Sequence, residues 1–298
     1  MQDTVPERAR VFDRRLLRVR RERAAANLTD HDFLLSEIGD RLADRLADVT
    51  RKFPLAFDLS CRDGVLARVL AGRGGIETLL QSDLSQRNAA DARQRGPSFV
   101  ADEELLPIKS QSLDAILSNL SLHWVNDLPG ALAQIRDALK PDGLFIASMF
   151  GAGTLSELRT CLMEAELAES GGVSPRVSPF AGLRDAASLL QRAGFALPVA
   201  DSDTLTVTYP DLFRLLADLR GMGETNLLLD RLKHPTRRAI FARAAALYHE
   251  RFADVDGRLR ATFQILFLTG WAPHESQQQP ARRGSGQADL RDVLGDRA

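Results

Sequence analysis

Short apolar segments alternate with segments of helical periodicity over residues 54–150, and this alternation limits the possible folds more than any other feature of the chain. Strands that alternate with helices form βαβ units with right-handed connections, so the pattern predicts an α/β fold with a parallel sheet. The apolar runs that predict the first five strands lie at 55–59, 78–81, 99–100, 113–117 and 143–150.

The flanking segments complete the predicted organisation. Residues 1–53 are predicted to form an N-terminal helical segment, because apolar residues recur at helical spacing from 34 to 49. Residues 54–275 are predicted to form the main domain, with a helical lid at about 210–257 between two late strands. Residues 276–298 are rich in Gln, Gly and Arg, a composition that predicts a disordered tail.

Charge and cysteine content argue against several classes of protein. The formal net charge is −1, so bulk charge gives no reason to expect a nucleic-acid partner. The 2 cysteines are too few for a disulfide scaffold or a cysteine-built metal site, and they fit a reducing compartment. No apolar run approaches the roughly 20 residues that a membrane-spanning helix needs.

The first 25 residues are basic, with eight arginines and four acids. They lack the apolar core of a secretory signal, and the acids disfavour a transit peptide. We expect a basic first helix that covers the domain or docks a partner. Thr29 or Asp30 is the expected N-cap of the helix that follows.

Three acids come at the ends of three successive predicted strands, namely Asp58, Asp83 and Asp102. Ligands of an open parallel sheet bind beyond the carboxyl ends of its strands, so these acids are expected to lie close together. The first would orient the loop, the second would accept both ribose hydroxyls, and the third would accept from an adenine amino group. Strands also end in Asp because it caps the next helix, but three such acids in register favour a nucleoside site.

The loop after the first strand, DLSCRDG at 58–64, favours S-adenosylmethionine over a dinucleotide. A pyrophosphate requires a G-x-G-x-x-G loop at a helix N-terminus, and this loop does not contain one. A Walker A lysine is absent as well.

Several motifs resemble class I S-adenosylmethionine-dependent methyltransferases of the methyltransferase type 11 kind. The similarity extends to the complex I assembly factor 5 family from about Phe12 to Ser285, with GMGETN at 221–226 among its most specific stretches. The resemblance implies a Rossmann-like, mostly parallel sheet with a reversed late strand, N-terminal helices and a helical lid. It also implies S-adenosylmethionine as cofactor and a role in maturation of respiratory complex I, and arginine hydroxylation is attributed to the family. The motifs lie at 55–64, 82–83, 100–107, 118–127, 139–150 and 268–276.

The loop departs from the D-x-G-x-G-x-G pattern of that fold, because Ser60 and Arg62 replace two glycines and Gly64 alone remains. A Cβ disfavours positive φ by about 1–2 kcal/mol. Two interpretations stay open: Arg62 pairs with the cofactor carboxylate, or the site is weakened. The candidate cofactor-binding residues are Asp58, Ser60, Gly64, Asp83, Leu84, Asp102, Glu103 and Asn119.

His123, in the segment NLSLHW after the fourth strand, is the candidate catalytic residue. An imidazole titrates near pH 6.5 and suits proton transfer, but His123 and Trp124 would also serve as a packed pocket wall. A second group, Arg176, Tyr209, Glu224 and Asn226, is expected either to be solvated or to touch substrate. No histidine begins the His-x-Asp/Glu pair typical of non-haem iron sites, so we assign no metal ligands.

The first functional hypothesis is a methyltransferase-like enzyme that binds S-adenosylmethionine and acts on a protein substrate, with a complex I subunit as the candidate. The reaction would be methyl transfer or, by the resemblance, arginine hydroxylation. The alternatives are a non-catalytic assembly scaffold with a degraded cofactor loop and a malonyl-acyl-carrier-protein O-methyltransferase. The expected location is the bacterial cytoplasm, with peripheral contact at the inner membrane left open, or the mitochondrial matrix side in a eukaryote.

Overall fold

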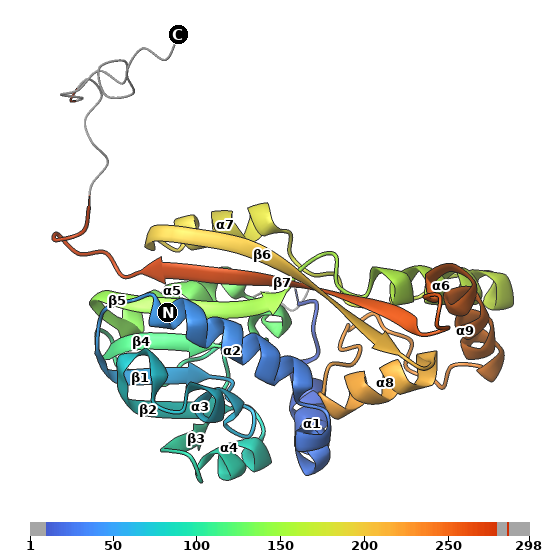
Figure 1. Ribbon diagram of the computed structural model, residues 1–298, viewed down its shortest axis with the longest axis horizontal. Helices are drawn as coiled ribbons and strands as arrows, with labels where there is room; N and C mark the ends of the chain where they lie inside the picture. The colour runs from blue at the N-terminus through green and yellow to red at the C-terminus, as the bar shows by residue number, and fades with distance from the viewer. Residues whose placement is uncertain (1–9, 279–284, 286–298) are drawn as a thin grey trace.

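The computed structural model describes residues 10–278 and residue 285, and these form a seven-stranded sheet with helices on both faces (Figure 1). The strand order is β3-β2-β1-β4-β5-β7-β6, in which β7 runs antiparallel to β5 and β6 and the other pairs are parallel. The predicted mostly parallel sheet with a reversed late strand is therefore confirmed. The strands are β1 (Phe53–Leu59), β2 (Ile76–Asp83), β3 (Ser98–Val100), β4 (Leu113–Ser118), β5 (Leu139–Phe150), β6 (Ala196–Tyr209) and β7 (Leu259–Trp271).

The helices connect and cover these strands. Asp127 caps α5 as its position indicates, since its Oδ1 accepts from the Gly130 N–H at 2.9 Å. The helices are α1 (Arg14–Ala24), α2 (Phe33–Ala47), α3 (Val65–Leu70), α4 (Gln86–Ala92), α5 (Leu128–Ala138), α6 (Ser156–Ser170), α7 (Leu183–Arg192), α8 (Leu212–Gly221) and α9 (Arg238–Phe252), with short 3-10 turns η2 (Ala25–Asp30), η3 (Arg73–Gly75) and η4 (Leu122–Trp124).

The expected cap of α2 at Thr29 or Asp30 is wrong. Both residues lie in η2, and α2 begins at Phe33 after Asp32. Leu28 is buried in the same apolar core as the leucines of α2, so the chain keeps its tight turn through Asp30 before the helix starts. The polar residues Thr29 and Asp30 thus indicated that a helix begins nearby, but they did not indicate its first residue.

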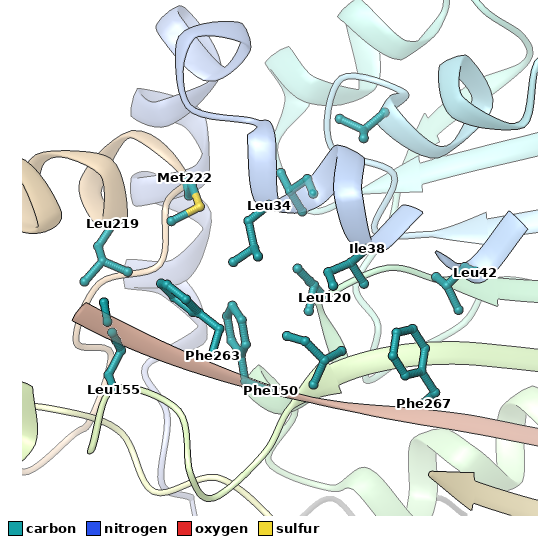
Figure 2. Close-up of a cluster of buried hydrophobic side chains, with 14 of the residues drawn as sticks. Leu34, Ile38, Leu42, Leu120, Phe150, Leu155, Leu219, Met222, Phe263 and Phe267 are labelled. Carbon is teal, nitrogen blue, oxygen red and sulfur yellow. The ribbon is translucent and has the colours of Figure 1, made fainter. Parts of the chain in front are cut away.

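The sheet is buried on both faces, and this explains why its inner strands are continuous apolar runs. Successive residues of β1 alternate between the two cores, with Ala56 in the core under α2 and α3 and Phe57 in the core under α5 and α7. Figure 2 shows part of the first core, where Ile38 and Leu42 of α2 face Phe267 of β7. The two cores hold the strand ends in place, and the loops at those ends carry the candidate site.

The late part of the chain extends the molecule beyond one end of the parallel strands. Figure 1 shows α6, α8 and α9 gathered where β6 and β7 project past the rest of the sheet, and α6 packs against α9. No helix among residues 10–278 is long and apolar enough to cross a membrane. Most of the predicted disordered tail falls outside the described residues, apart from 276–278 and 285.

Candidate functional site

The loop between β1 and α3 keeps the backbone shape of a glycine-rich loop with one glycine. Ser60, Arg62 and Gly64 all have positive φ, at 68°, 55° and 85°. The first two pay about 1–2 kcal/mol each for that conformation. A Cβ at Gly64 would lie 2.9 Å from Oε1 of Gln81, so this position has little room for a side chain. Strained backbone of this kind is typically retained at functional sites.

Asp58 lies at the end of β1 with a fully buried carboxylate, and neither of its oxygens has a hydrogen-bond partner among the described residues. Burial, together with the nearby Asp83, raises the pKa of Asp58 to about 8. An unpartnered buried acceptor is costly, and a ligand group that donates a hydrogen bond would remove that cost. The void beside Asp58, which Ser60, Arg62 and Asn119 also line, has no room for a water molecule.

The acids at the next two strand ends are engaged by arginines of α1. Arg21 is fully buried, and its Nη1 lies 2.6 Å from Oε1 of Glu103 and 3.7 Å from Oδ2 of Asp83. Arg14 pairs with Asp102 and Glu103. Although burial opposes ionisation of Glu103, the two guanidinium groups hold its pKa well below the usual range. Helix α1 therefore covers the carboxyl ends of β2 and β3.

The remaining cofactor candidates are less directly exposed to a ligand. Leu84 belongs to an apolar cluster with Phe12 and Trp124. The amide of Asn119 is satisfied by the protein, since it donates to the Leu35 carbonyl at 2.8 Å and accepts from the hydroxyl of Ser148 at 2.9 Å. The hydroxyl of Ser60 donates to Glu103. The loop and the acids at the ends of β1, β2 and β3 thus come together, as their positions at parallel strand ends predict.

The residue types at these strand ends are suited to bind a nucleoside cofactor. The loop backbone has the required positive φ values, and the orphaned Asp58 carboxylate marks an acceptor without a donor. Asp83 also has ordered donors on both oxygens, with the Ser85 N–H at 2.8 Å and the Arg62 N–H at 3.2 Å. A ribose at Asp83 and Glu103 would compete with Arg21 for the same carboxylates.

A second cluster centres on Glu224, in the loop after α8. Its carboxylate accepts from Arg62 Nη2 at 2.6 Å, Trp124 Nε1 at 2.7 Å and His123 Nε2 at 3.1 Å. Burial alone would raise the pKa of Glu224, but His123, Arg62 and Arg21 outweigh it and lower the pKa to about 2. Arg62 therefore pairs with this carboxylate, a partner outside both interpretations of the sequence.

His123 is buried and packs against three aromatic rings, with centroids of Phe150, Trp124 and Phe180 at 4.6, 5.0 and 5.6 Å. The Phe150 N–H donates to Nδ1 at 3.5 Å, so Nε2 carries the proton that is donated to Glu224. Burial lowers the pKa of His123, and the carboxylate of Glu224 opposes this shift. In this arrangement His123 orients Glu224, and its role as a general base stays a prediction.

A cavity of about 280 Å³ lies on the other side of Glu224, between β5, α6, α8 and α9. Of the residues that the sequence singled out beside Glu224, Arg176 and Asn226 line it, whereas Tyr209 does not. The roles of Arg14 and Arg21 were missed, although their spacing of seven residues puts them on one face of a helix. No group of three or more His, Cys, Asp or Glu side chains suited to a metal ion occurs in the part of the chain that the structure describes.

Comparison with known proteins identifies relatives over nearly the whole chain. A family model described as a methyltransferase domain matches residues 57–147. The chain is 45% identical over 287 residues to arginine-hydroxylase NDUFAF5, mitochondrial, from Homo sapiens, covering 95% of this chain and 83% of the relative. It is 32% identical over 270 residues to malonyl-[acyl-carrier protein] O-methyltransferase from Xylella fastidiosa, covering 88% of this chain and 89% of the relative. The solved structure of the YcgJ protein from Bacillus subtilis shares the fold, with a TM-score of 0.55 at 13% identity over 78% of this chain and 98% of that one.

Proposed function

Because the chain belongs to the NDUFAF5 arginine-hydroxylase family and has a class I methyltransferase fold, we propose that it binds S-adenosylmethionine and modifies an arginine of a protein substrate during assembly of respiratory complex I. The observation that supports cofactor binding is the buried carboxylate of Asp58, which has no hydrogen-bond partner among the described residues, beside a loop with positive φ at residues 60, 62 and 64. Arginine as the modified residue is supported by the relatives, which are named arginine-hydroxylases, and by the buried carboxylate of Glu224, which binds a guanidinium.

The site has two ends, one with residues that would bind the cofactor and one with residues that would contact the substrate. Asp58 and the loop 60–64 would hold the methionine end of the cofactor, while Asp83 and Glu103 would accept the ribose hydroxyls. When bound, the cofactor supplies a methyl group on a sulfonium, and such transfer depends mainly on alignment of the acceptor. Glu224 binds the guanidinium of Arg62 at 2.6 Å, so a substrate guanidinium would have to replace that of Arg62 to be oriented by this carboxylate.

The test is a reaction of the purified full-length protein with S-adenosylmethionine and arginine-containing complex I subunits, followed by mass spectrometry of the substrate. We expect a modified arginine. Methyl transfer releases S-adenosylhomocysteine, whereas an added oxygen requires dioxygen and a two-electron reductant, which a parallel reaction includes, and the mass gained distinguishes the two products. Asp58→Asn and Glu224→Gln should both abolish the product, whereas the exposed Asp230→Asn should not. An unmodified substrate would count against the enzymatic proposal.

The non-catalytic scaffold is the second candidate, and the ion pairs of α1 favour it. Arg14 and Arg21 occupy all three acids that the ribose and adenine would use. In that case, calorimetry would show no binding of S-adenosylmethionine to wild-type protein, while the subunit would still co-purify. Restored cofactor binding in Ser60→Gly/Arg62→Gly would show that this chain has lost an ancestral site.

A further inference from the structure

The cavity beside Glu224 has apolar walls and a strongly basic lining. Its volume is about 280 Å³, close to the lower end of the range for small-molecule sites. Phe150 and Phe263 form part of one wall, with ring centroids 6.0 Å apart, and Figure 2 shows Leu155 and Leu219 beside them. Such walls accommodate a hydrocarbon or aromatic body.

Four arginines line this cavity, namely Arg20, Arg176, Arg220 and Arg231. Two of them are paired with acids outside the cavity: Arg176 lies 2.5 Å from Glu166, and Arg231 lies 3.4 Å from Asp13. Among the described residues, Arg20 donates only to neutral groups, the hydroxyl of Thr225 and the carbonyl of Asn226. The guanidinium of Arg220 has no hydrogen bond or ion pair to any residue within 10–278.

Among the described residues that line the cavity, Glu224 is the one acid, and its carboxylate already has hydrogen-bond donors. It accepts from Arg62, Trp124 and His123, so little of its charge is available to the cavity. The arginines also act on one another. Burial lowers the pKa of Arg20, and the like charges of Arg231, Arg23 and Arg220 lower it further, although Asp13 partly opposes this effect. A bound anion would relieve this repulsion, whereas a cation would increase it.

We propose that this cavity is a binding site for a small organic anion, a single carboxylate carried on an apolar body. The carboxylate would lie between Arg20 and Arg220, because these two lack an acidic partner among the described residues. The body would lie against Phe150 and Phe263. The proposal concerns a subsite separate from the cofactor loop, so it does not depend on cofactor binding or on turnover.

Three probes with the same body test the charge requirement by calorimetry on the full-length protein: 4-phenylbutanoate, 4-phenylbutanol and 4-phenylbutylamine. We expect the acid to bind about tenfold or more tightly than the alcohol, because an ion-assisted hydrogen bond contributes roughly 1.5–3 kcal/mol. The amine should bind most weakly. A blocked Phe-Glu dipeptide, compared with the free acid, shows whether the carboxylate comes from a small molecule or from a protein side chain, and binding of either supports the site.

Tryptophan fluorescence shows whether the probe binds in this cavity. Of the 2 tryptophans, Trp124 lines the cavity and Trp271 lies at the end of β7, so Trp271→Phe leaves a reporter at the site. The acid should quench this emission. Arg220→Gln should weaken binding of the acid about tenfold without affecting binding of the alcohol, whereas Arg184→Gln, an exposed arginine on α7, should change neither.

The result that would overturn the proposal is equal binding of all three probes, no binding of either acid, or a preference for the amine. A preference for the amine would assign the cavity to a substrate guanidinium bound at Glu224. Because Arg220 is exposed and its guanidinium has no hydrogen bond or ion pair within 10–278, loss of binding in Arg220→Gln with an unchanged circular dichroism spectrum could not be attributed to misfolding.

Discussion

Asp58 combines two costs that a folded protein seldom retains without a use. Its carboxyl group is buried without a hydrogen-bond partner in the described chain, and the nearby Asp83 would repel its ionised form. The adjoining Ser60 and Arg62 hold positive φ, a conformation that a side chain disfavours. Since ordinary loop residues would avoid all of these costs, the combination indicates selection for a bound group rather than for stability.

Asp58→Asn is expected to stabilise the protein at high pH and to flatten its pH dependence. The pKa of Asp58 is raised from its ordinary 3.8 to about 8. Between these values the unfolded chain has lost the proton that the folded protein keeps, so the free energy of unfolding falls as pH rises, on the order of 1 kcal/mol per pH unit. Urea denaturation of both proteins from about pH 5 to about pH 8 measures this slope.

The exposed Asp230→Asn is the matched control and should keep the wild-type slope. If Asp58→Asn also keeps the wild-type slope across that window, Asp58 is ionised in the folded protein and must have a donor that the structure does not contain.

The buried pair of Arg62 and Glu224 should behave as a unit. Glu224→Gln leaves the guanidinium of Arg62 buried without its carboxylate, at a cost of about 3 kcal/mol in the free energy of unfolding. The double variant Arg62→Met/Glu224→Gln should recover most of that loss, because no uncompensated charge remains. Chemical denaturation of the two single variants and the double variant gives the coupling energy, and strictly additive losses would contradict the pairing.

At the scale of elements, α1 determines whether the cofactor end is accessible. Arg14 and Arg21 lie on one face of this helix and reach Asp83, Asp102 and Glu103. Eight arginines in the first 25 residues predicted a basic helix that covers the domain or docks a partner, and the structure shows α1 over the strand ends. The specific partners could not be predicted, because they depend on where the helix packs and not on its own sequence.

Arg21→Gln is expected to strengthen binding of S-adenosylhomocysteine about tenfold. The wild-type protein must give up the contacts of Arg21 with Glu103 and Asp83 before a ribose can use them, and a charge-assisted contact is worth roughly 1.5–3 kcal/mol. Isothermal titration calorimetry measures the change. Arg18→Gln, an exposed arginine of the same helix, is the control and should bind as the wild type does. Weaker binding in Arg21→Gln would instead make Arg21 a cofactor contact.

Sequence patterns predicted the elements unevenly, for physical reasons. The inner strands were found because burial on both faces makes them unbroken apolar runs. Helix α6 was not anticipated, although Leu158, Cys161, Leu162 and Ala165 have helical spacing and are all buried. The first half of β6 was missed because much of Ala196–Asp203 is exposed, so no apolar run marks it.

For the whole molecule, the sequence predicts which residues come together where the sheet topology determines it, but not where packing of distant segments determines it. Asp58, Asp83 and Asp102 could be placed together from sequence, because the carboxyl ends of neighbouring parallel strands meet at one edge. The clustering of His123 and Trp124 around Glu224 could not, because Glu224 is about a hundred residues away and belongs to the loop after α8. Long-range contacts of this kind leave no local pattern in the chain.

One segment links the two ends of the site. The residues before α1 pair with the loop that follows Glu224, through Asp13 N–H to Leu227 O at 2.8 Å and Leu229 N–H to Val11 O at 2.9 Å. Helix α1 itself contacts the acids of the cofactor end. Movement of α1 would therefore change the contacts of Glu103 and the position of the loop that carries Glu224.

Hydrogen exchange with and without S-adenosylhomocysteine tests this link. Because ligand and Arg21 compete for the same carboxylates, we expect binding to slow exchange in the loop 58–64 and to speed it in α1. Exchange should also rise in 222–231, since Leu227 and Leu229 lose their backbone hydrogen bonds to the segment before α1 when the helix withdraws. Segment 183–192, the α7 helix on the other face of the sheet, should be unchanged. Protection of α1 on binding would mean that the helix closes over the ligand, and an unchanged 222–231 would mean that the two ends of the site act independently.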